Sequence, residues 1–146
     1  MIWVGIDCGK HTGMAVWDDV ERRFISIATL PLHAALFAVR DLAQNNRDLT
    51  VVFEDARLRK WLPRERSLAE FKGRAMGGGS VRRDATIWQE FLTAFGISFI
   101  AQAPTRGLTK WNAESFARVT GYQQRTSEHA RDAALLVYGR KSTTRR

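Results

Sequence analysis

Cysteine is almost absent from this sequence. The chain of 146 residues has one, Cys8, which excludes a framework of disulfides and a zinc site built from several cysteines. A protein without disulfides suits a reducing compartment, and we expect this one to be cytoplasmic.

Long apolar runs are missing as well. The apolar start, Met1 to Ile6, is too short for a signal peptide or a membrane span, and no basic region precedes it. No other stretch approaches the length that a membrane span needs. We therefore expect a protein with no membrane partner.

Acidic residues are few beside the basic ones. Aspartate and glutamate together number 15, against 23 lysines and arginines, which gives a net charge of +8. This excess favours a polyanionic partner, with nucleic acid as the first candidate, and a merely solubilising surface is the alternative. Apolar residues make up 45% of the chain, which suits one folded domain and excludes a disordered chain.

Five short apolar segments are predicted to be strands. They span residues 2–7, 14–17, 23–30, 49–55 and 97–101. Only short turns separate the first three, so these three are expected to pair as an antiparallel meander.

Apolar residues at helical spacing predict the remaining elements. Helices are expected over residues 32–46, 81–95, 110–120 and 128–138. Ser80 is the predicted N-cap of the second of these helices, and Ser127 that of the last. The segment from Ala56 to Gly79 is basic and ends in three glycines, so we expect a loop there, with a helical turn around Ser67 to Met76.

The order of these elements predicts the fold class. It is β-β-β-α-β-α-β-α, with an extra helical piece near Lys110, and it indicates an α/β protein with a mixed five-stranded sheet flanked by helices. Residues 1–140 form the predicted domain, and residues 141–146 form a basic tail.

Two acidic residues stand where predicted strands end. Asp7 ends the first strand and Glu54 the fourth, and the two side chains emerge side by side if these strands are parallel neighbours. A carboxylate at the end of a buried strand is costly unless it is paired or binds a metal. Asp7 has the alternative role of capping the turn that follows it, and Asp55 competes with Glu54.

A third acidic residue lies on the last predicted helix. His129 and Asp132 are three residues apart and share a helix face with the apolar residues Ala133, Leu136 and Val137. Polar groups on a buried stripe need partners, and metal-bound oxygen chemistry supplies them. A lone histidine in this place is more often structural, but the neighbouring Asp132 favours a functional role.

Carboxylates gathered at one site repel each other unless cations neutralise them. Mg²⁺ prefers such oxygen ligands, and two ions about 3.5–4 Å apart clamp the attacking and leaving oxygens of a phosphoryl displacement. The imidazole of His129 suits a softer ion such as Mn²⁺, or proton transfer.

The segments that carry these residues resemble a known family. "GIDCGKHTG", "VVFEDAR" and "SEHARDAALLV" together are similar to the RuvC-type Holliday junction resolvases, in the variety found in phages and their bacterial hosts. The resemblance covers nearly the whole chain and implies a ribonuclease H-like fold. It also implies a homodimer that nicks four-way DNA junctions with divalent metal, in a bacterial cell or a phage-infected host.

The resemblance assigns roles to individual residues. Asp7, Glu54, His129 and Asp132 match the residues that hold Mg²⁺ or Mn²⁺ in this family, with two ions expected per active site. Lys110 resembles a basic residue that approaches the cut phosphate.

The basic residues supply the predicted DNA contacts, with a solvated face as the alternative. Where the family has an aromatic wedge, three residues after the glutamate, this chain has Arg57, and the nearest aromatic residue is Trp61. The predicted DNA-binding residues are Arg57, Arg59, Lys60, Trp61, Lys72, Arg74, Arg82, Arg83 and Lys110.

These residues together lead to the hypothesis of a crossover junction endodeoxyribonuclease, which resolves branched DNA by paired nicks. One alternative is a ribonuclease H that cuts RNA–DNA hybrids, and another is a junction-binding protein without catalysis. A small kinase is a less favoured alternative, in which the turn after Asp7 would hold the phosphates of ATP. Such kinases need a second lobe, for which 146 residues leave no room.

Overall fold

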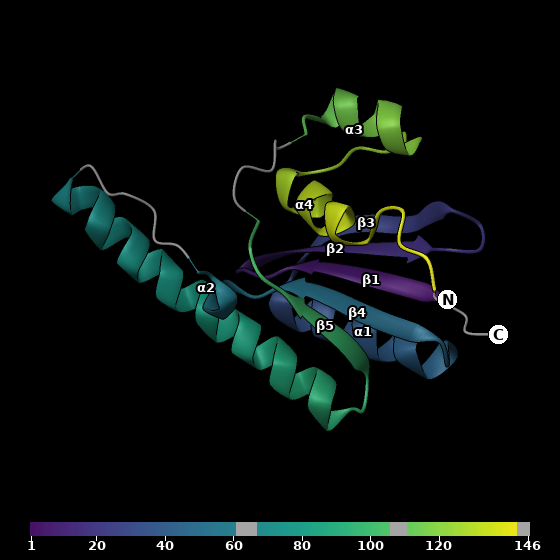
Figure 1. Ribbon diagram of the computed structural model, residues 1–146, viewed down its shortest axis with the longest axis horizontal. Coiled ribbons are helices and arrows are strands. Elements are labelled where there is room, and N and C mark those ends of the chain that lie inside the picture. Colours follow the sequence, from purple (N-terminus) through teal and green to yellow (C-terminus); the bar gives the residue numbers. More distant parts are fainter. Residues whose placement is uncertain (61–66, 106–110, 143–146) are drawn as a thin grey trace.

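One mixed sheet forms the centre of the molecule. The computed structural model of the chain describes residues 1–60, 67–105 and 111–142, apart from the side chains of residues 71, 74 and 75. The strands are β1 (Ile2–Asp7), β2 (His11–Asp18), β3 (Arg23–Pro31), β4 (Leu49–Glu54) and β5 (Ser98–Gln102), in the spatial order β3-β2-β1-β4-β5 (Figure 1). The first three pair antiparallel, and β4 runs parallel to β1 and to β5. The predicted meander and mixed sheet are confirmed.

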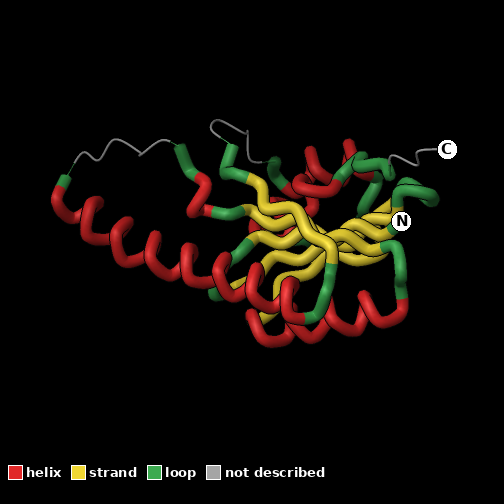
Figure 2. The backbone as a smooth tube through the Cα atoms, turned by 60° about the horizontal axis from the view of Figure 1, so that its bottom comes forward, coloured by secondary structure: helices red, strands yellow, loops and turns green. Residues whose placement is uncertain are grey.

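Helices cover both faces of this sheet. They are α1 (Leu32–Asn45), the short 3-10 helix η1 (Ala56–Leu58), α2 (Leu68–Ala94), α3 (Ala113–Thr120) and α4 (Glu128–Val137). Figure 2 shows the sheet as the middle layer, with the long α2 and α1 on one side and the shorter C-terminal helices on the other. None of the described helices is both long and apolar enough to cross a membrane.

Strand alternation divides the core into two clusters of buried side chains. On β1, Val4 and Ile6 pack with residues of α1 and α2, whereas Trp3 packs with residues of α3 and α4. Side chains two residues apart share a face, so Asp7 belongs to the α4 side of the sheet and Cys8 to the α2 side. The same alternation places Glu54 and Asp55 on opposite sides.

Helix α2 begins thirteen residues before the predicted start at Val81, and the prediction of a loop with a single helical turn over residues 68–79 was wrong. Its N-cap is Ser67, whose Oγ accepts a hydrogen bond of 3.2 Å from the Glu70 N–H. Gly73 and the three consecutive glycines lie inside the helix, where each costs about 1 kcal/mol relative to alanine. The flanking residues, from Leu68 to Met76, favour helix strongly enough to continue it through this weakness.

The other boundaries lie close to their predicted positions. The third predicted helix begins after Asn112, whose side chain accepts a hydrogen bond of 2.8 Å from the Ser115 N–H. The last helix begins after Ser127, as predicted, because the Ser127 Oγ accepts a hydrogen bond of 3.1 Å from the Ala130 N–H. Strand β2 starts at His11, earlier than predicted, so the turn after β1 is shorter.

Candidate functional site

Asp7 and Glu54 end two neighbouring parallel strands. Ile6 of β1 pairs with Phe53 of β4, and one residue further each strand reaches its acidic end. Both strands therefore deliver a carboxylate to the same edge of the sheet. The strand arrangement that the sequence predicted for these two residues is confirmed.

Two glycines let α4 lie directly on the strands. A Cβ atom placed on Gly5 would collide with the Ala133 carbonyl oxygen, and one placed on Gly13 would collide with the His129 carbonyl oxygen. The backbone of the helix therefore touches the backbone of β1 and β2, with no side chain between them. This close approach carries His129 to the acidic edge of the sheet, and sequence reasoning missed the role of both glycines.

His129 and Asp7 contact each other directly. The distance between His129 Nδ1 and Asp7 Oδ2 is 2.9 Å, and the two side chains are 55% and 21% exposed. An ionised carboxylate only accepts hydrogen bonds, so Nδ1 carries the shared hydrogen and Nε2 of a neutral ring keeps its lone pair. The exposed imidazole thus presents an atom that can take a proton or bind a cation.

The four predicted ligands are of the right kinds for Mg²⁺ or Mn²⁺, being three carboxylates and an imidazole. Asp132 follows His129 by three residues on α4, and Glu54 lies on the strand beside Asp7. Within the described parts of the chain, no group of three or more His, Cys, Asp or Glu side chains lies close enough to hold a metal ion. A cation can therefore gather this donor set only if side chains turn toward it.

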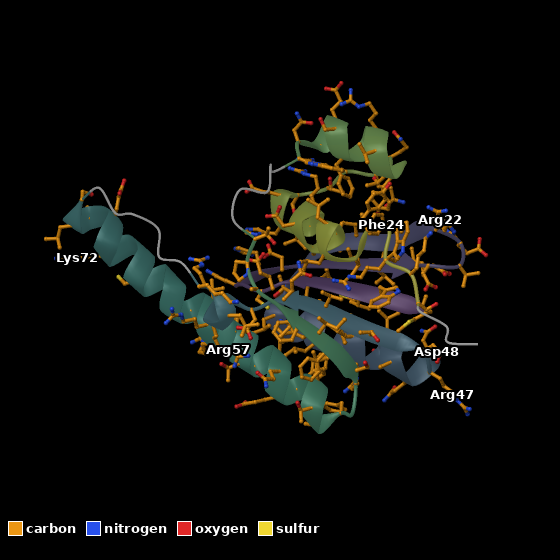
Figure 3. The ribbon with its side chains drawn as sticks, viewed as in Figure 1. Arg22, Phe24, Arg47, Asp48, Arg57 and Lys72 are labelled. Carbon is orange, nitrogen blue, oxygen red and sulfur yellow. The ribbon has the colours of Figure 1, made fainter. Side chains whose placement is uncertain are left out.

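The predicted DNA contacts are spread over η1 and α2. Arg59, Lys60, Lys72, Arg82 and Arg83 are exposed. Figure 3 shows Lys72 on the part of α2 that extends beyond the sheet. Lys110 and Trp61 lie outside the described residues, as does the side chain of Arg74. These roles stay predictions.

Asp55, which competes with Glu54 in the sequence, has a different environment. It is 2% exposed and lies against Arg57, with 2.7 Å between Asp55 Oδ2 and Arg57 Nη2. The hydrogen bonds from Arg57 lower the pKa of the Asp55 carboxyl, although burial opposes them. Asp55 is therefore a buried, paired carboxylate rather than a solvated one.

Cys8 and Asp84 are two further residues near this edge that sequence reasoning missed. Burial raises the pKa of the Cys8 thiol, and the charges of Asp7, Asp55, Asp84 and Glu54 raise it further. Four carboxylates therefore lie around one buried thiol, two on each side of the sheet. A signal for Asp84 was available, because it shares a helix face with Trp88, four residues later.

The Asp84 carboxylate is buried, and one of its oxygens lacks a hydrogen bond among the described residues. Its side chain is 2% exposed, and Oδ1 has no hydrogen-bond partner among the residues that the structure describes. In the described part of the chain, the Arg83 guanidinium lies near it, with 3.6 Å between Arg83 Nη2 and Asp84 Oδ1. That distance is too long for a hydrogen bond, and the Arg83 side chain is 72% exposed.

Replacing Asp84 by asparagine is expected to stabilise the protein. At pH 7, Asp84→Asn should raise the free energy of unfolding by about 1 kcal/mol, because a buried carboxylate whose cation is exposed and beyond hydrogen-bond distance costs more than a buried amide. Urea denaturation measures the change, with Asp48→Asn as an exposed control. A loss of stability in Asp84→Asn would show instead that the carboxylate has a stabilising partner.

Comparisons with known proteins identify the fold. No protein-family model and no curated protein sequence matches the chain. Among solved structures, Thermus thermophilus RuvC in complex with a Holliday junction substrate is similar, with a TM-score of 0.60 and 15% identity. The match covers 95% of this chain and 91% of that one. A second Thermus thermophilus RuvC structure has a TM-score of 0.55 and 16% identity, over 95% of this chain and 92% of that one. The predicted ribonuclease H-like fold is confirmed.

Proposed function

We propose that this protein is a metal-dependent endonuclease that resolves four-way junctions and other branched DNA by paired nicks. The observation that carries the proposal is the contact between Asp7 and His129 at the edge where β1 and β4 end. The fold shared with a RuvC structure bound to a Holliday junction supports the choice of substrate. The net charge of +8 suits a partner of this kind.

The proposed cation site consists of four residues: Asp7, Glu54, His129 and Asp132. Two divalent ions bound there would supply an activated water and stabilise the charge that develops on the phosphate. Asp7 orients the imidazole by accepting the Nδ1 hydrogen, which leaves the one lone pair of His129 Nε2 either to bind an ion or to accept a proton from the attacking water. The exposure of the His129 ring leaves it accessible to a DNA strand.

The basic residues form the proposed DNA surface. Lys110 steadies the phosphate that is cut, while Arg59 and Lys60 after η1, and Arg82 and Arg83 on α2, neutralise flanking phosphates. A homodimer would present two such sites to a two-fold junction, and paired nicks follow from that symmetry. We place the protein in the cytoplasm of a bacterial cell or a phage-infected host.

Cleavage of a labelled four-way junction tests the proposal. The purified protein with Mg²⁺ or Mn²⁺ should place symmetric nicks in the junction and leave a linear duplex of the same sequence intact. Cleavage of an RNA–DNA hybrid alone would assign ribonuclease H activity instead. Tight junction binding without cleavage in either metal would indicate a binding protein.

A further inference from the structure

Arg57 is an exposed residue whose guanidinium is nevertheless engaged by other side chains of the protein. The Nε and Nη2 groups donate to the two Asp55 oxygens at 2.8 and 2.7 Å. Nη1 donates to Thr86 Oγ1 at 3.2 Å, and Nη2 also donates to Gln89 Oε1. These four hydrogen bonds occupy most of the five N–H donors of a guanidinium, so little remains for a DNA phosphate.

The partners of Arg57 belong to two different elements. Asp55 is the first residue after β4, and its own N–H donates to the Gln102 carbonyl at 2.8 Å. Thr86 and Gln89 are three residues apart on α2. Figure 3 shows Arg57 where α2 passes the edge of the sheet. The side chain therefore joins the end of β4 to α2, on the side of the sheet away from α4.

Asp55 would be a costly residue without this arginine. Its carboxylate is almost fully buried, and apart from the Arg57 guanidinium it accepts a hydrogen bond of 2.9 Å from the Arg57 backbone N–H. A buried charge that loses its partner is destabilising by several kcal/mol. An unpaired Asp55 next to Glu54 would also attract the divalent cation that Glu54 is proposed to bind.

We propose that Arg57 is a positioning residue, which holds the Asp55 carboxylate on the α2 side, where strand alternation directs it, so that Glu54 alone faces the cation site. In this role it acts through Asp55 and makes no contact with the DNA. The inference rests on the proposed function for the meaning of the cation site. It replaces the sequence-based prediction of Arg57 as a DNA contact.

Metal binding separates this role from the alternatives. Titration calorimetry with Mn²⁺ should show about tenfold tighter binding to Arg57→Ala, because the substitution removes a positive charge and adds the freed Asp55 carboxylate to the oxygen ligands within reach. Asp55→Asn in the Arg57→Ala background should remove most of that gain, because the competing carboxylate is gone. Arg57→Lys should be intermediate, since lysine keeps the charge but has no planar pair of donors.

The salt dependence of junction binding tests the absence of a DNA contact. The slope of log K against log salt should stay unchanged in Arg57→Ala, whereas Arg82→Ala should reduce its magnitude by about one. Arg47→Ala, at the opposite end of the sheet, controls for the loss of one positive charge (Figure 3).

Three results would overturn the inference. One is a reduced salt slope in Arg57→Ala with normal Mn²⁺ affinity, which would make Arg57 a DNA contact. Another is lower thermal stability with normal Mn²⁺ affinity, which would leave only a structural role. The third is a gain in Mn²⁺ affinity in Arg57→Ala that Asp55→Asn does not reverse. A wild-type protein that binds Mn²⁺ but cuts no junction would refute only the proposed function. The Mn²⁺ titrations would still test the role of Arg57, because they do not depend on cleavage.

Discussion

Asp7→Asn is expected to reduce junction cleavage by about a thousandfold or more, because metal ligation supplies several kcal/mol of transition-state stabilisation. The amide keeps the size of the side chain and can still accept a hydrogen bond from His129, so the fold should survive. Junction affinity should change little, since phosphate contacts dominate it. Single-turnover cleavage of a labelled junction with saturating Mn²⁺ measures the rate.

Asp48→Asn is the matched control for this substitution. Asp48 is exposed and lies at the end of the sheet away from the candidate site, as Figure 3 shows. It should cut at the wild-type rate. If Asp7→Asn retained more than about a tenth of that rate, a difference below 1.4 kcal/mol, Asp7 would not be an essential ligand.

Gly13→Ala is expected to destabilise the protein strongly. The new Cβ would collide with the carbonyl oxygen of His129, which is backbone and cannot rotate away. Helix α4 must then shift outward, and overpacking of this kind costs about 3 kcal/mol. Because the shift also moves the His129 ring from Asp7, cleavage should fall together with stability. Thermal unfolding and junction cleavage measure the two effects.

Gly9→Ala provides the comparison. Gly9 lies in the turn after β1, and the nearest atom to a Cβ placed there is the His11 carbonyl oxygen at 3.8 Å, an ordinary contact. Its stability should stay within about 0.5 kcal/mol of the wild type, as for most surface substitutions. Equal melting temperatures for the two variants would mean that α4 can leave the strands without cost.

The sequence was sufficient to predict the acidic edge of the sheet. Asp7 and Glu54 each follow an apolar strand, and the ends of parallel neighbours necessarily meet at one edge. The N-cap role of Ser127 could also be predicted, because an N-cap side chain bonds to a backbone N–H within the first turn of its own helix. Each of these inferences depends on residues close together in the chain or on a general property of strands.

The features that were missed depend on partners far along the chain. Arg57 reads as a basic surface residue until Thr86 and Gln89 of α2 are placed beside it. The glycines of α2 predict an interruption of the helix, because glycine has a low helix propensity and the sequence alone does not show that the helix continues on both sides. A glycine inside a strand can mark either a weak strand or a place where another backbone packs closely, and the sequence around Gly5 and Gly13 does not distinguish the two.

The contact between Asp7 and His129 spans 122 residues, which has a consequence during synthesis. A ribosome that adds roughly 5–20 residues per second exposes Asp7 on the order of ten seconds before α4 exists. In that interval the strands can pair, but the imidazole is missing and the glycine backbones of β1 and β2 are uncovered. A nascent or prematurely terminated chain therefore lacks the complete candidate site, and the proposed nuclease activity would begin only after the last helix has docked.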